Sequence, residues 1–141
     1  MKARKINMTQ MFLESGEAVP VTLVMPLGEE IEVSEGDMVR VSGVSKGKGF
    51  QGVVKRHGFK GGRRSHGQKH SEREPGSIGG GGRAGGRVVK GMRMAGRMGG
   101  NRVTVKNLQV VKVVPESKEV YIKGALPGRR GSSLEVKKLG S

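Results

Sequence analysis

The sequence predicts an all-β fold: a small β-barrel with one long, basic, glycine-rich extended loop and no long helices. Six or seven short apolar segments at strand spacing alternate with turns rich in glycine and proline, and no segment keeps a helical period over ten residues. Residues 43–100, by contrast, contain 19 glycines and 14 lysines and arginines but only two acids. We therefore expect a barrel in two parts, residues 1–42 and 101–141, joined through this loop.

The first part of the barrel contains three strand candidates. A turn rich in acids precedes a strand at Ala18–Met25, in which Pro20 favours an edge position or a strand start. Glu30–Val33 is a short candidate. After a second acidic turn, Met38–Val44 alternates apolar and polar residues, as a half-buried strand does.

The second part of the barrel begins where β-branched residues return, at Arg102–Val114. The apolar pattern changes phase at Asn107, which indicates a bulge or a break into two strands. A four-residue turn containing a proline then separates this segment from Glu119–Lys123, which predicts a hairpin. After a Leu-Pro-Gly turn, Leu134–Lys137 is the last strand candidate.

The intervening loop holds most of the chain's net charge of +15. Its start at Gly52–Arg56 suggests one more strand, but from Phe59 to Met98 no period holds for long. Glycine loses the most entropy on ordering, so a partner must offset that cost. Cations on such a backbone favour an anionic polymer, whose phosphates release counterions on binding.

Composition excludes several classes of protein. The chain has no cysteine, which removes disulfides and thiolate metal sites, and no apolar stretch long enough to span a membrane. Only 33% of residues are hydrophobic and 3% aromatic, which is low for a self-sufficient globule. We expect a cytoplasmic protein without cofactor, metal, membrane or small-molecule substrate, and no enzymatic activity.

Gly47–Gly52 matches the G-x-G-x-x-G pattern of dinucleotide-binding turns. That reading also needs a following helix and an acid about 20 residues on; Glu72 stands there, but no helical pattern lies between. A nucleotide-binding oxidoreductase rests on this motif alone. A flexible turn that offers its amides, Lys46 and Lys48 to phosphates is favoured.

Histidines and acids inside the loop allow two further readings. His57, His66 and His70 are too few for a metal site among so many cations, so contacts to bases or phosphates are favoured over a metal, with solvated loop residues as the plain alternative. Glu72 and Glu74 lack a neighbouring nucleophile or base, which favours ion pairs with local arginines over catalysis.

We do not expect the loop to bind nucleic acid mainly by stacking aromatic side chains on bases, because Phe50 and Phe59 are its only aromatic residues. Met92, Met94 and Met98 suit either ribose and base faces or the protein's own barrel. Lysine and arginine with glycine favour backbone and shape recognition of a folded RNA, while phosphate contacts alone leave DNA open.

The candidate RNA-binding residues share a basic, hydrogen-bonding or base-facing side chain in or beside the loop. They are Lys46, Lys48, Phe50, Lys55, Arg56, His57, Arg63, Arg64, His66, Lys69, His70, Arg73, Ser77, Arg83, Arg87, Lys90, Arg93, Met94, Arg97, Met98 and Arg102.

Several strings resemble the family of large ribosomal subunit protein three. Asn7 replaces a glycine of that family's opening motif, and the match covers nearly the whole chain. The matching strings are Lys5–Phe12, Val19–Thr22, Val44–Arg56, His66–Gly67, His70–Ser71, Pro75–Gly79, Lys90–Gly99 and Lys123–Gly128.

The resemblance implies a split β-barrel like the second domain of translation elongation factors. It also implies a member of the cytoplasmic large ribosomal subunit that binds its rRNA early in assembly, beside proteins fourteen and nineteen. The loop tip would approach the peptidyl-transferase centre.

Two departures from the family matter. The usual insert after the strand ending near Met25 is absent, and the tip, Gly79–Gly86, leaves Arg83 as its one long side chain, which we expect to make the deepest contact. A free nucleic-acid chaperone or nucleoid protein remains the alternative function.

Overall fold

The computed structural model describes residues 1–28, 30–80 and 85–139. The chain divides into two compact units: Met1–Lys46 with Gly100–Ser141, and Gly47–Gly99. The first unit holds the barrel strands and the second contains most of the basic loop, and each is described by itself.

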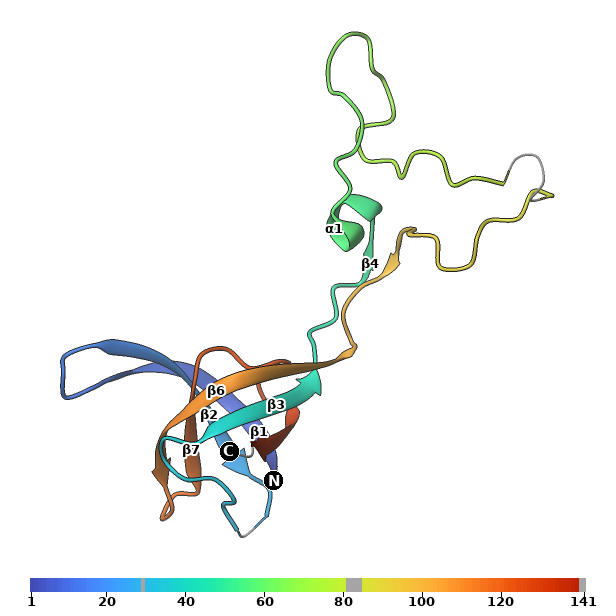
Figure 1. The fold of residues 1–141 in the computed structure, drawn as a ribbon. Coiled ribbons are helices and arrows are strands. Elements are labelled where there is room, and N and C mark those ends of the chain that lie inside the picture. Colours follow the sequence, from blue (N-terminus) through green and yellow to red (C-terminus); the bar gives the residue numbers. More distant parts are fainter. Residues whose placement is uncertain (29, 81–84, 140–141) are drawn as a thin grey trace. The chain divides into compact units, whose positions relative to one another are not determined.

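The first unit is a closed antiparallel barrel of six strands in the order β1-β2-β7-β6-β3-β8, which confirms the predicted all-β class. In Figure 1, β3 and β6 run side by side, and their register pairs Val44 with Arg102. The strands are β1 (Lys2–Phe12), β2 (Ala18–Pro26), β3 (Met38–Val44), β6 (Arg102–Val114), β7 (Glu119–Lys123) and β8 (Ser133–Lys138).

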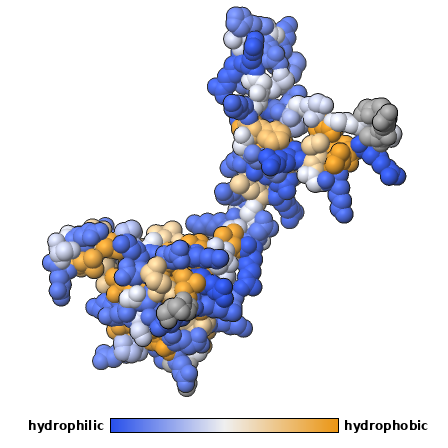
Figure 2. All heavy atoms as spheres, in the orientation of Figure 1, coloured by the Kyte–Doolittle hydropathy of each residue, from blue (hydrophilic) through white to orange (hydrophobic). Residues whose placement is uncertain are grey.

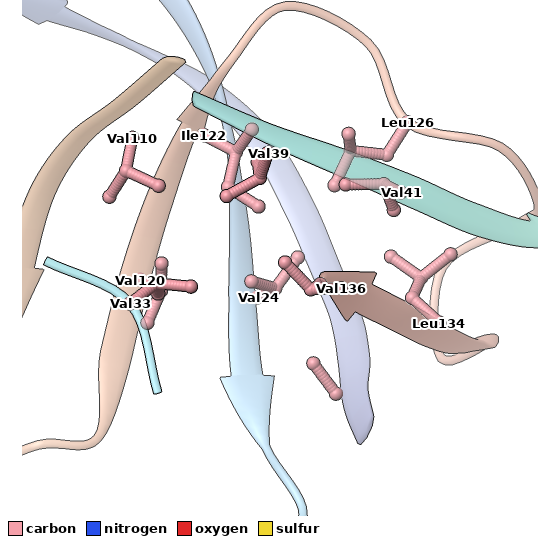
Figure 3. Packing of buried hydrophobic residues seen from close by; sticks show 11 residues of the cluster. Val24, Val33, Val39, Val41, Val110, Val120, Ile122, Leu126, Leu134 and Val136 are labelled. Carbon is pink, nitrogen blue, oxygen red and sulfur yellow. The ribbon is translucent and has the colours of Figure 1, made fainter. Parts of the chain in front are cut away.

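The interior of the barrel is filled mainly by valines. Figure 3 shows side chains such as Val39, Val120 and Ile122, each fully buried, meeting inside the ring of strands. Val33 and Leu126 join them from connecting segments rather than strands. A narrow barrel has room for small branched side chains, and valine also favours the extended backbone. The inward positions of the strands therefore specify both the fold and its core.

Most strand predictions of the sequence are confirmed. Met38–Val44 and Glu119–Lys123 have the predicted bounds, and the strands at 18 and 134 are longer by one or two residues. The expected bulge is present: the register between β3 and β6 shifts between Val39 and Val41, and Asn107 adopts a φ of 57°. A positive φ is accessible to asparagine, so the phase change in the sequence marks a real kink.

One predicted strand of the barrel is absent, one expectation is met only in part, and one strand was missed. Glu30–Val33 is not a strand. Val33 lies in an irregular segment and its side chain packs into the core, so its apolar character reflects burial and not strand pairing. β2 is not an edge strand, because it lies between β1 and β7. The other placement expected for Pro20, near a strand start, fits better, since Pro20 is the third residue of β2. β1 was not predicted at all, because only Ala3 and Lys5 of its residues are buried and its sequence shows no apolar alternation.

One lysine belongs to the barrel interior. Lys5 is 7% exposed, and its Nζ donates to the carbonyl oxygens of Leu126 (2.7 Å) and Gly128 (3.1 Å). Burial, and to a lesser degree the charge of Lys46, lowers the pKa of Lys5. Lys5 therefore fixes the turn before β8, where Gly128 has a φ of 84°.

Candidate nucleic-acid interface

The second unit, Gly47–Gly99, has little regular structure (Figure 1). Its elements are β4 (Phe50–Gln51), α1 (Val53–His57) and β5 (Gly96–Arg97), and β4 pairs with β5. The Lys48 amide donates to Met98 O (2.8 Å) and the Met98 amide to Gly49 O (2.9 Å). These bonds join the outgoing and returning arms at their base.

A short helix replaces the strand expected at Gly52–Arg56, so that prediction is wrong. Gly52 is extended and precedes α1, and Gly58, with a φ of 72°, ends it by donating its amide to Val54 O (3.0 Å). A left-handed glycine is the usual end of a helix. The two valines suggested a strand, but the flanking glycines and the burial of Val53 determine a single helical turn.

Side chains of α1 hold the returning arm. Arg56 Nη1 donates to Met94 O (2.8 Å), and His57 Nε2 donates to the same oxygen (3.0 Å). A Cβ on Gly96 would lie 2.5 Å from Arg56 Nη1, so this glycine makes room for the guanidinium. Both residues were expected to contact RNA, but the structure places both in internal contacts, half-buried.

A second contact closes the outer loop on itself. The Gly62 amide donates to Ser71 O and Glu72 O, both at 3.2 Å. A Cβ on Gly61 would lie 1.9 Å from Glu72 O, so only glycine fits this approach. Arg64 Nε lies 3.6 Å from Glu72 Oε2, which confirms the local ion pair expected for that acid. Residues 62–71 thus form a closed loop with few other internal contacts.

The remaining cations of this unit face solvent. Among the residues described in 47–99, the Arg64–Glu72 contact is the only ion pair. Phe50 is 74% exposed, and Met94 and Met98 are half-buried. Figure 2 shows hydrophilic residues over most of the visible surface of this unit, with apolar patches between them. The exposed candidates are Lys48, Lys55, Arg63, Arg64, His66, Lys69, His70, Arg73, Ser77, Arg87, Lys90, Arg93 and Arg97.

Apart from Arg64, these cations have no ion-pair partner among the residues that the structure describes, and phosphates are the complementary ligands. Lys60 is equally exposed in this unit and was missed. Its signal in the sequence was a basic side chain in the glycine-rich loop, as for the other candidates. Arg83, expected to make the deepest contact, lies outside the described residues.

Two candidates belong to the barrel unit. Lys46 is exposed, and Arg102 forms an ion pair with Glu135, which also contacts Lys137 Nζ (2.9 Å). Lys137 foremost, and also Arg102, lowers the pKa of Glu135. A shallow groove of about 230 Å³ over β3, β6 and β8 is lined by Arg40, Ser42, Arg102, Thr104, Glu135 and Lys137. Sequence analysis missed Arg40 and Lys137, although both occupy outward positions of predicted strands.

Comparison with known proteins identifies the family. The model of the family described as ribosomal protein L3 matches residues 3–120. Large ribosomal subunit protein uL3 of Chloroherpeton thalassium is 56% identical over 112 residues, which cover 77% of this chain and 53% of that protein. The chain belongs to the ribosomal protein L3 family. The resemblance inferred from the sequence strings is therefore confirmed.

Two other relatives define the extent of the match. The uL3 protein of Chlorobaculum tepidum is 52% identical over 124 residues, covering 88% of this chain and 54% of that protein. That of Streptococcus mutans is 45% identical over 116 residues, covering 80% and 54%. This member of the L3 family thus spans about half the length of the curated relatives it matches.

The structure also bears on the alternatives considered for this L3 family member. Gly47–Gly52 contains β4, which pairs antiparallel with β5, and the helix that follows has five residues, so the strand, turn and long helix of a dinucleotide site are not formed. Within residues 1–28, 30–80 and 85–139, no three histidine, aspartate or glutamate side chains gather as metal ligands would. No helix in the same residues is both long and apolar enough to cross a membrane.

Proposed function

We propose that this chain is a non-catalytic structural component of the large ribosomal subunit and binds large-subunit rRNA through residues 47–99. The observation that carries the proposal is the array of exposed lysines and arginines in 47–99 with a single ion pair among its described residues. The relatives named as large ribosomal subunit proteins support the ribosomal setting.

Recognition in this proposal acts through the RNA backbone. Arginines such as Arg63, Arg73 and Arg93 pair with phosphates, each releasing counterions. Positive-φ glycines, such as Gly79 (φ 77°) and Gly80 (φ 99°), shape an extended backbone that no apolar core supports. Such contacts read the shape of a folded RNA more than its sequence.

We further propose that the chain joins the subunit early in assembly in the cytoplasm, beside proteins fourteen and nineteen, with its loop tip toward the peptidyl-transferase centre. The motif resemblance supports these details. Arg83 is the residue proposed for the deepest contact, because its neighbours in Gly79–Gly86 are glycines and one alanine and leave it as the one long side chain there.

The test is binding to large-subunit rRNA over a range of salt. Neutralisation of about ten phosphates predicts that log K falls with log salt at a slope of roughly −7 to −9. Co-sedimentation with large subunits should survive a high-salt wash. Equal affinity for unrelated RNA and loss of the protein in that wash would favour a free nucleic-acid chaperone instead.

A further inference from the structure

The distal half of β1 is an open sheet edge. β1 pairs with β8 only at Lys2–Arg4. Beyond that pairing, the Lys5 backbone still bonds toward β8: its amide donates to Ser132 O, and its carbonyl accepts from the Gly131 amide. The register with β2 then shifts between Lys5 and Asn7. From Asn7 to Phe12, β2 is the sole strand partner among the residues that the structure describes. This edge lies on the blue hairpin of Figure 1.

The pairing pattern shows which backbone groups point outward. The Leu13 amide donates to Glu17 O (2.9 Å), so that pair is hydrogen-bonded. Pairs alternate along an antiparallel ladder, so Met8, Gln10 and Phe12 occupy the pairs without hydrogen bonds. Their amides and carbonyls therefore point away from β2, toward the open edge.

Pro20 supports this assignment. It lies opposite Gln10, in a pair that requires no amide donor, and its carbonyl accepts from the Gly124 amide (2.8 Å), on the side away from β1. The proline therefore protects none of the outward groups of β1. The free donors and acceptors are those of Met8, Gln10 and Phe12.

The edge lacks the features that usually prevent strand addition. Between Asn7 and Phe12 there is no charge and no proline, whereas natural edge strands commonly carry lysine or proline. Met8 is 48% and Phe12 69% exposed, and both lie at outward-bonding positions. Met8, Thr9 and Gln10 line a shallow, open depression of about 440 Å³ with Pro20. An added strand would find the apolar side chains of Met8 and Phe12 on one face, with Gln10 between them.

The local charge indicates what kind of partner fits. In a chain of net charge +15, the segment from Ile6 to Val39 has no lysine or arginine and seven acids. Glu14 and Glu17, in the hairpin turn beyond Phe12, are exposed and form no ion pair with any residue that the structure describes. This region would repel RNA phosphates and attract a cationic polypeptide. The same segment of a second copy contains no lysine or arginine that could pair with Glu14 and Glu17.

We propose that Asn7–Phe12 is a docking edge for an extended segment of another, basic protein. The segment adds to β1 as a further strand and forms ladder bonds with Met8, Gln10 and Phe12. Small apolar side chains at alternate positions pack along Met8 and Phe12, and lysines or arginines at one end lie over Glu14 and Glu17. This surface is additional to the RNA interface proposed above.

Amide hydrogen exchange on the whole chain tests the proposal. The probe is a capped synthetic peptide in which two N-terminal lysines precede alternating threonine and valine. At about 90% occupancy, the amides of Met8, Gln10 and Phe12 should exchange about tenfold more slowly, because only the free fraction exchanges. Those of Thr9 and Met11, already bonded to β2, should change little. A matched peptide with N-methyl groups on the residues facing β1 should produce no protection.

Two variants complete the test. Gln10→Pro removes an outward amide that the barrel does not use, so Thr9 and Met11 should stay protected while peptide binding is lost. Gln10→Lys keeps the amide and should weaken binding several-fold by repulsion of the lysines. Equal binding of the N-methylated peptide, or protection without alternation, would overturn the proposal. So would protection of the edge by an RNA oligonucleotide, or concentration-dependent protection of the free protein, which would assign the edge to RNA or to a second copy.

Discussion

The barrel and the 47–99 unit are stabilised by different means. The barrel has a cluster of eleven buried residues, and every strand pairs on both sides over part of its length. Among the described residues of 47–99, only Val53 is buried. Apolar burial of the first kind offsets the entropy of ordering a chain, and one valine does not. The barrel therefore has the apolar burial that stabilises a fold, whereas on the function proposed above the second unit would gain ordering energy from RNA.

The largest expected effect is a loss of rRNA affinity when positive charge is removed from the 47–99 unit. Replacing Arg63, Arg73, Arg87 and Arg93 by glutamine removes four exposed cations of 47–99. At 0.15 M salt this should weaken rRNA binding about 10²–10³-fold and flatten the log-log salt slope by roughly 3 to 4. The melting temperature of the barrel should not change, because none of these side chains contributes to its core.

A matched control changes four exposed lysines of the barrel. Lys2, Lys106, Lys112 and Lys123 are exposed and form no ion pair within the described residues. Their replacement by glutamine changes the net charge equally. Filter binding should show a much smaller loss of affinity; an equal loss would mean that total charge, and not the 47–99 unit, binds RNA.

A second prediction separates the units by their packing. Ile122→Ala empties a fully buried position of the barrel and should cost about 2–5 kcal/mol of unfolding free energy in urea titrations. Val53→Ala should instead accelerate exchange only within α1. A comparable loss of global stability from Val53→Ala would show that the two units unfold together.

The contrast also explains what the sequence could predict. The bounds of β3 followed from the alternation of apolar and polar residues, and those of β7 from the proline-containing turn before it. β1 lacked that signal, since only Ala3 and Lys5 of its residues are buried. The buried lysine is explained by carbonyls of Leu126 and Gly128, far along the chain.

In the candidate site, the sequence predicted the positive charge but not the internal contacts. The exposed cations follow from composition, because only two acids, Glu72 and Glu74, stand among the 14 lysines and arginines of residues 43–100. The roles of Arg56 and His57 depend on Met94 O, more than thirty residues away, and on the space left by Gly96. Helix α1 likewise depends on two flanking glycines that outweigh the strand preference of its valines.

A smaller effect is expected from breaking the contact between Arg56 on α1 and the returning arm of the 47–99 unit. Gly96→Val places a side chain where Arg56 Nη1 now lies and should release its bond to Met94 O. We expect a local cost of about 1–2 kcal/mol, seen as faster amide exchange at Lys48 and Met98. Gly47→Ala is the matched control, because a Cβ there meets no atom within 4 Å. If both variants exchange alike, the Arg56 contact does not hold the arms.

The smallest effect belongs to the barrel and depends on pH. Asp37 accepts a bond from Lys138 Nζ on β8 (2.8 Å to Oδ1) and another from the Ser34 amide (2.9 Å to Oδ2). The Lys138 contact first, then the Ser34 amide, lowers the pKa of Asp37 in the folded protein.

Because the folded-state pKa lies below the unfolded one, the stabilisation is complete above the unfolded value. It is lost as pH falls through the folded value. The barrel should therefore become less stable on acidification, and part of that slope should disappear in Asp37→Asn. Glu135, whose pKa is lowered by Lys137 and Arg102, adds a similar dependence, so the comparison is best made in a Glu135→Gln background. Urea midpoints measured from neutral pH downward provide the test, and identical slopes with and without Asp37 would show that its contacts with Lys138 and Ser34 do not persist in solution.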